Sequence, residues 1–533
     1  MHLTLYLAIA LLGGGVNALK STATEDYIAT ESPIAKRNVL NNIGPPVGAL
    51  PGVVSVASSN NTDPSSRFTW IRDSAMVMKS LINEFTLGLD TSLRDTIETY
   101  LLGQYRTQLI TNPSGTVSTG GLAEPRFNFD YTADTTSFSR PENDGPPLRA
   151  NNLITYANWL VDEDKNTTFV ENVLWPSISL DIDYILHHWN ETSFELWEIA
   201  WTESYWTAAV EVHALRSAAI LGRKIGRDYE VKGWESTASV ILSFMQSFWN
   251  NQANYVSGNT IPDRSGIDSS TVLASIYNYD PLAGCDSLTL QPCSDRALMN
   301  LKAVVDGFRP LYPINSKTGA AAVGLWTEDT VFGSPWHLST FGVAEQLYDA
   351  LAVWNQTSSI TVTTLSLPFF QQFFIAALAI TYRPGFIGYQ EILDGVKAFA
   401  DNTILIAANY TPQDGMLPQM FDKEDGKPLG ANGLSWSYSA ALSAFDARNG
   451  LKPASWGAQG LAQSCTSQHS ADAFSFEEAG FLERMYKAAA EFFQGYRGYQ
   501  EYAYHQGYRI IEQDSYEAPA AYMYSRVFRE YGR

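Results

Sequence analysis

The stretch FTWIRDSAMVMKSL at residues 68–81 carries the pattern that decides the fold. After Trp70-Ile71-Arg72-Asp73, apolar residues recur at spacings of three and four, which predicts a helix over 73–87. The same spacing returns along the chain, whereas strand-like alternation is scarce. It predicts further helices over 31–42, 92–110, 149–163, 168–187, 205–222, 234–249, 268–278, 296–309, 336–354, 366–380, 389–408 and 435–447. We therefore expect an all-α protein.

Long loops separate these helices, and they are rich in Gly, Pro, Asn, Asp and aromatic residues. The loops cover residues 43–71, 111–148, 250–267, 310–335 and 409–434. Loops of this length in a compact domain are usually functional. The layout predicts an all-α barrel of helix hairpins, with long loops forming a pocket at one end. An open solenoid is the alternative, but it requires a repeat period that the sequence lacks.

The composition indicates a globular protein and excludes some partners. The 533 residues are 45% hydrophobic and carry a net charge of −21. Such a charge repels nucleic-acid phosphates and anionic membranes, so we expect neither as a partner. No run of about 18 uncharged apolar residues follows the N-terminal segment, so no transmembrane helix is expected.

The N-terminal segment is typical of a secreted protein. An apolar run over 3–12 precedes Val16-Asn17-Ala18, which resembles a cleavage site, so residues 1–18 are predicted to be a signal peptide. An N-terminal core helix is the alternative. Sequons for N-glycosylation occur at Asn60, Asn166, Asn190, Asn355 and Asn409.

The three cysteines and the C-terminal tail allow fewer conclusions. In an oxidising compartment, Cys285 and Cys293 can close a small local disulfide, whereas a metal site lacks further ligands nearby. Cys465 is then left over, either buried or as a free thiol. Residues 476–533 hold ten of the 28 tyrosines, and this tail either packs against the barrel or forms an aromatic binding surface.

The chemical motifs are carboxylates beside aromatic residues. Signatures of zinc proteases, dinucleotide sites, P-loops and serine hydrolases are absent, so no metal or cofactor is expected. Glu195-Leu196-Trp197-Glu198 and the Arg72-Asp73 pair instead combine aromatic rings with charged groups. Rings stack on the apolar faces of sugars, charged groups bind hydroxyls, and an acid can protonate a glycosidic oxygen. Taken singly, acidic residues near helix starts are more often caps.

These motifs resemble the glucoamylases of glycoside hydrolase family 15 over most of residues 37–470. The matching stretches include VLNNIGPP (39–46), FTWIRDSAMVMKSL (68–81), SRPENDGPPLRA (139–150), WNETSFELWE (189–198), QPCSDRALMNLKAVVDGFR (291–309) and LSWSYSAAL (434–442). The resemblance implies an (α/α)6 catalytic domain over residues 19–470 that releases glucose from chain ends with inversion. The tail over residues 471–533 shows no recognisable starch-binding module.

The resemblance also implies residue roles. Glu198 falls on the general acid, and Arg72 and Asp73 fall on the pair that grips the terminal glucose. Glu195 stands where the family has Asp. The aromatic residues of the pocket wall correspond to Trp197, Trp336 and Trp436. Cys285–Cys293 matches a family disulfide, whereas the usual partner position of Cys465 is Ser243.

Several family positions are changed. Gln419, in LPQMFDK (417–423), occupies the position of the catalytic base, and an amide cannot accept the proton of the attacking water. The family's carboxylate after the acid is replaced by Ile199, and a pocket arginine is replaced by Leu325. Phe138 replaces a loop tryptophan, and Ser66 replaces a tyrosine that contacts the water.

Three functional hypotheses follow. The first is a weak glucoamylase-like hydrolase acting on α-glucan. The second is an inactive carbohydrate-binding relative, and the third is a repurposed enzyme in which Glu198 acts alone on a less polar ligand beside Ile199, Leu325 and Met420. We expect a monomer.

Overall fold

A computed structural model describes residues 22–58 and 64–461 of the protein, and this part is mostly helical. Its helices of eight or more residues are α1 (Ala23–Asn41), α2 (Ile71–Thr86), α3 (Arg94–Gln108), α4 (Gly145–Trp159), α6 (Trp175–His188), α7 (Tyr205–Lys224), α8 (Trp234–Met245), α9 (Ser270–Tyr277), α10 (Asp295–Phe308), α11 (His337–Thr357), α13 (Tyr389–Asn409) and α14 (Ser435–Arg448). Two short helices are α5 (Thr167–Phe169) and α12 (Leu367–Phe370). The all-α class expected from the apolar spacing is confirmed.

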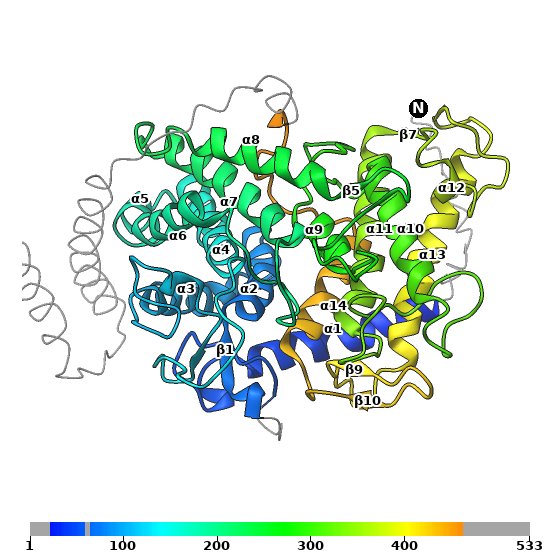
Figure 1. Ribbon diagram of the computed structural model, residues 1–533. Coiled ribbons are helices and arrows are strands. Elements are labelled where there is room, and N and C mark those ends of the chain that lie inside the picture. Colours follow the sequence, from blue (N-terminus) through cyan, green and yellow to red (C-terminus); the bar gives the residue numbers. More distant parts are fainter. Residues whose placement is uncertain (1–21, 59–63, 462–533) are drawn as a thin grey trace, which may run out of the picture.

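The twelve longer helices form two concentric rings (Figure 1). In the inner ring, α2, α4, α7, α9, α11 and α14 each pack against the next, and α14 packs against α2 to close the ring. The helices α1, α3, α6, α8, α10 and α13 alternate with them along the chain and form the outer ring. This architecture is the expected (α/α)6 barrel, and closure of the ring excludes an open solenoid.

Burial differs between the rings, as their sequences require. The inner helix α11 is buried on nearly every side from His337 to Leu351, so it carries few charges. The outer helix α13 buries one face, which includes Ile392, Val396 and Ala400, and exposes the other.

Short strands hold the loops in place. They form five antiparallel pairs: β1 (Phe68–Trp70) with β2 (Arg126–Asn128), β3 (Ser193–Phe194) with β4 (Trp201–Thr202), β5 (Trp249–Asn250) with β6 (Tyr255–Val256), β7 (Ile360–Thr361) with β8 (Thr381–Tyr382), and β9 (Met420–Phe421) with β10 (Pro428–Leu429). None exceeds three residues, so these pairs act as clips on the loops.

Buried polar groups join the first long loop to the last helix. The Asn42 side chain donates from Nδ2 to Ser435 Oγ at 2.9 Å, and Ser435 Oγ donates to the carbonyl of Ser55 at 2.6 Å. Asn42 and Ser435 are fully or nearly fully buried, so each would cost free energy if left unpaired. These bonds therefore fix the 43–58 loop onto the start of α14.

The helix predicted over 366–380 is wrong beyond its first turn. Only α12, Leu367–Phe370, is helical, and the chain then turns back into β8. The apolar residues that suggested a helix have another role here, because Phe373 packs over Gly395 and Phe374 packs over Gly388 at the start of α13. Two helices begin earlier than predicted: α1 begins at Ala23 instead of residue 31, and α4 begins at Gly145 instead of residue 149.

Some expectations concern residues outside the described ranges. These are the signal peptide over 1–18, the sequon at Asn60, Cys465 and the tail over 471–533. Among the described residues, no helix combines the length and the apolarity that crossing a bilayer requires.

Candidate active site

The start of helix α2 positions the first two candidate residues. Strand β1 pairs with β2 in the register Trp70↔Arg126, and the helix begins directly after Trp70, which adopts an extended backbone. Arg72 and Asp73 consequently lie in the first turn of an inner helix, and both are buried.

Arg72 is the centre of a buried ionic network. Its Nη1 atom donates to both Asp144 carboxylate oxygens at 2.9–3.0 Å and lies 2.8 Å from Glu142 Oε2. Its Nη2 atom donates to Glu198 Oε1 at 2.8 Å. Asp144 also accepts a hydrogen bond from Trp206 Nε1 at 2.7 Å. The network holds the guanidinium rigidly, with Nη2 directed at the candidate acid.

Glu198 lies in the loop that joins β3 to β4. The carboxylate of Glu195 shapes this loop, because it accepts backbone N–H groups of Trp197, Ile199 and Ala200 at 2.6–3.3 Å. Glu198 itself has a φ of 66°, a conformation that is uncommon for a residue with a side chain. Its side chain remains 26% exposed, although Arg72 beside it is buried. The Glu195 carboxylate thus supports the loop that presents Glu198.

The surroundings raise the pKa of several carboxyl groups here. Burial raises the pKa of Glu198 to about 7, with a further increase from Asp73, while Arg72 opposes the shift. Burial likewise raises the pKa of Asp73 to about 6 and, with Asp268, raises that of Glu195 to about 7. A carboxyl group with a pKa near 7 stays protonated in mildly acidic solution, as a general acid must.

Three tryptophans predicted from the sequence lie at the same end of the barrel. Trp197 donates from Nε1 to Asp268 Oδ1 at 2.9 Å, and its ring centroid lies 6.4 Å from that of Trp336. Trp336 directly precedes α11, and Trp436 lies in the first turn of α14. Both are therefore carried by the N-terminal ends of inner helices, as Arg72 is.

Gln419 lies at the same end of the barrel as Trp336, because Met420, the next residue, pairs with Trp336. Met420 forms a β-bridge with Trp336, and the Gln419 backbone N–H donates to the carbonyl of Ala431 at 2.9 Å. Its side-chain Oε1 accepts the N–H of Ala431 at 3.0 Å. A Cβ on Gly430 would lie 2.3 Å from this Oε1 atom, so glycine is needed beside it. Glu424, by contrast, is exposed in the β9–β10 turn.

The changed positions have mixed surroundings. Ile199 follows the candidate acid and is 38% exposed, whereas Leu325 and Met420 are buried. Phe138 packs edge-on against Trp70 with ring centroids 4.9 Å apart. Ser66 is buried in the short 3-10 helix η2 (Pro64–Arg67) that precedes β1.

Sequence reasoning missed the carboxylates that hold Arg72. Glu142 and Asp144 lie in SRPENDGPPLRA (139–150), one of the stretches that resemble the family. Burial raises the pKa of Glu142 well above its usual range, although Arg72 opposes this. Two acids just before a Pro-Pro helix start could have indicated partners for a buried arginine.

The remaining predicted residues take no part in the network around Arg72. The Cys285–Cys293 disulfide is present. Ser243 donates to the carbonyl of Ser239 within α8. Asn190, Asn355 and Asn409 are exposed and Asn166 is half-buried. No group of three or more potential metal ligands occurs in residues 22–58 and 64–461.

Tryptophan faces beside a carboxyl of raised pKa suit a sugar ring and its glycosidic oxygen, so fold and site define an enzyme that cleaves glycosides. Residues 33–446 match the family described as glycosyl hydrolases family 15. Glucoamylase-1 of Schizophyllum commune is 44% identical over 470 residues, 86% of this chain and 81% of the relative. A glucoamylase of Neurospora crassa is 43% identical, over 85% of this chain and 73% of the relative.

Solved structures agree. The glycoside hydrolase family 15 glucoamylase of Hypocrea jecorina superposes with a TM-score of 0.80 at 41% identity, covering 84% of this chain and 76% of that one. The glucoamylase of Hormoconis resinae gives 0.77 at 37% identity, over 84% and 77% of the two chains. The chain belongs to glycosyl hydrolases family 15.

Proposed function

We propose that the protein is an exo-acting α-glucan hydrolase that releases glucose from chain ends with inversion, at a low rate. The observation that carries the proposal is the contact between Arg72 Nη2 and Glu198 Oε1, with the pKa of Glu198 raised to about 7. The 44% identity to a glucoamylase supports the choice of α-1,4-glucan as substrate.

In the proposed reaction, Glu198 donates its proton to the glycosidic oxygen as the bond to the anomeric carbon breaks. A water molecule attacks that carbon from the opposite face, and its proton leaves to solvent because the Gln419 amide cannot accept it. Gln419 can only orient the water by hydrogen bonding. Asp73 has no hydrogen-bonded side-chain partner among the described residues, so its carboxylate is available to bind a sugar hydroxyl beside Arg72.

The test is release of glucose from maltose and soluble starch by the wild-type protein, Glu198→Gln and Gln419→Glu. We expect slow release that disappears in Glu198→Gln, and β-glucose as the first product by NMR, as inversion requires. Equal rates for wild type and Glu198→Gln would contradict the assignment of the acid.

A second function is favoured by the apolar residues beside the acid. Ile199 exposes 38% of its surface next to Glu198, where it can contact a ligand of low polarity. In this case Glu198 protonates a substrate in an elimination or cyclisation that needs no activated water. Absence of glucose release in wild type and in Gln419→Glu, with both proteins folded, would favour this function.

We also propose that the protein is secreted and glycosylated. The exposure of Asn190, Asn355 and Asn409 supports it, because a glycan needs an accessible acceptor. Intact mass before and after enzymatic deglycosylation should reveal glycans on a chain that begins near Leu19. An uncleaved chain without glycans would overturn this proposal.

A further inference from the structure

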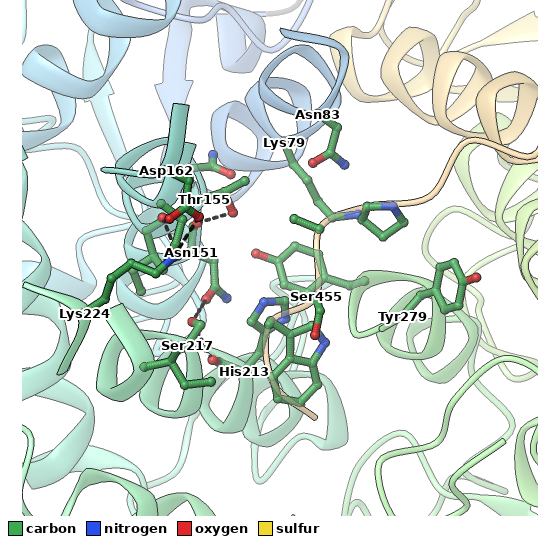
Figure 2. A pocket seen from close by; sticks show the side chains of 18 residues that line it. Lys79, Asn83, Asn151, Thr155, Asp162, His213, Ser217, Lys224, Tyr279 and Ser455 are labelled. Carbon is green, nitrogen blue, oxygen red and sulfur yellow. Dashed lines mark hydrogen bonds and ion pairs between the residues drawn. The ribbon is translucent and has the colours of Figure 1, made fainter. Parts of the chain in front are cut away.

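A cavity of about 330 Å³, drawn in Figure 2, is lined by the C-terminal halves of inner helices, whereas Arg72 lies at the N-terminal end of α2. Its lining comes from the later turns of inner helices α2, α4 and α7, from the end of α9, and from residues 453–456 after α14. Figure 2 shows Asn151, Thr155 and Ser217 on one side of the cavity and Lys79 above it, while the Tyr279 hydroxyl points away from them. The volume falls at the lower end of the range for small-molecule sites.

Aromatic rings form part of the wall. Trp456 stacks on His213 with ring centroids 4.4 Å apart, and Trp456 Nε1 is held by the carbonyl of Asn278. Burial lowers the pKa of His213 to about 3, so this ring is neutral at ordinary pH. Lys79 Nζ lies 5.1 Å from the centroid of the Tyr277 ring. The wall thus offers flat, uncharged surfaces that are held in place.

Two buried polar atoms on the lining lack a hydrogen-bond partner among the described residues. They are Asn151 Nδ2 and the Tyr279 hydroxyl, and the exposed fractions of the two residues are 3% and 2%. A contact with the Asn151 side chain lowers the pKa of the Tyr277 hydroxyl, although Asn151 Nδ2 makes no regular hydrogen bond. An unpaired buried donor is costly, so Asn151 Nδ2, which lies among the lining side chains in Figure 2, favours a ligand that carries oxygen atoms.

Carboxyl groups accompany both lysines on the lining, and Asp280 lies behind the 455–458 segment. Lys224 Nζ pairs with Asp162 at 2.8 Å in a partly exposed position that marks the mouth. Lys79 interacts with Glu345 and Asp349, and it opposes the rise that burial causes in the pKa of both carboxyl groups. No excess of positive charge is left to attract an anion.

We propose that this cavity binds a neutral, hydroxylated ligand of mono- to disaccharide size. One of its oxygen atoms accepts a hydrogen bond from Asn151 Nδ2, while its apolar face lies on the aromatic wall. The inference does not rest on the proposed hydrolysis, because ligand binding at this end requires no catalysis at Glu198.

The test uses D-glucose as the probe and hydrogen exchange with mass spectrometry as the readout on the full chain. We expect millimolar glucose to slow exchange in peptides covering 449–457, next to the cavity, at least twofold. Thr155 lines the cavity, so Thr155→Phe should abolish this protection, whereas Thr155→Ser should keep it. Protection near 195–200, at the other end, reports the catalytic proposal separately.

Asn158 lies at the mouth, where its Oδ1 accepts Lys224 Nζ at 3.0 Å. Asn158→Trp blocks entry without entering the core, so it replaces Thr155→Phe if that variant does not fold. Protection of 449–457 that persists in a folded blocking variant overturns the proposal, as does no protection in wild type. Equal protection by inorganic phosphate overturns the preference for a neutral ligand.

Discussion

Changing Gln419 to Glu tests the chemistry of the site most directly. The variant keeps the side-chain length and the oxygen that accepts the Ala431 N–H at 3.0 Å. The Gln419 Nε2 atom makes no hydrogen bond within the described residues, so the second carboxylate oxygen loses none. We therefore expect the variant to fold like the wild type, with a carboxylate whose ionised form the Ala431 N–H favours.

The size of the gain follows from what remains unchanged. A positioned general base contributes about 10²–10⁴ in rate. Ile199 and Leu325 stay apolar in the variant, so contacts with sugar hydroxyls that polar residues could make are not restored. We expect kcat/KM for maltose to rise by about tenfold or more, which corresponds to about 1.4 kcal/mol at the transition state.

The assay is initial-rate glucose release from maltose at pH 5. Gln413→Glu is the matched control, because Gln413 is an exposed glutamine on the same loop and gains the same charge. It should leave the rate unchanged. The reasoning is refuted if wild type is already as fast as its relatives and Gln419→Ala has no effect, since another residue would then be the base.

Three further predictions concern the acid, acid stability and the disulfide. With the pKa of Glu198 raised to about 7, kcat/KM should be high below pH 7 and should fall as the pH rises through 7. Glu198→Gln should lower kcat/KM by about 10²-fold or more and should make it independent of pH in this range. Burial raises the pKa of Glu345 and Asp446 from 4.5 and 3.8 to about 7, so between these values the folded state binds more protons than the unfolded state. Stability should therefore fall as the pH rises, and the Tm should be higher at pH 5 than at pH 7.5. A calorimetric Tm that is lower at pH 5 would contradict this. Replacing either Cys285 or Cys293 by Ser breaks the disulfide, which joins residues separated by 8 positions. Each single variant should lose about 2 kcal/mol in the free energy of unfolding and show a lower Tm.

The fold was predictable because its helices have regular apolar spacing. The predicted helix over 73–87 corresponds to α2, Ile71–Thr86, and that over 389–408 corresponds to α13. The failure over 366–380 has a local cause, since aromatic residues packing over glycines reproduce helical spacing without a helix. Ring closure was not readable from spacing, because it depends on contact between α2 and α14 at opposite ends of the barrel sequence.

The part of the candidate site that lies within a single sequence motif could be predicted from the sequence. Glu195 and Glu198 share a loop, and the structure adds only that the Glu195 carboxylate shapes it. The pairing of Arg72 with Glu142 and Asp144 joins residues about seventy positions apart, so the two acids before the Pro-Pro helix start could suggest a buried cation but not which arginine it is. The roles assigned to Arg72, Glu198 and Gln419 stay predictions until the variants are measured.

The first and last helices of the barrel begin and end beside one another. Glu25, in the first turn of α1, lies 3.5 Å from Arg448, in the last turn of α14, and the two helices pack together. The closed ring therefore does not require the chain to start at α1 and end at α14. A circularly permuted gene that links residue 449 to residue 22 and opens the exposed turn over 226–230 should encode the same barrel.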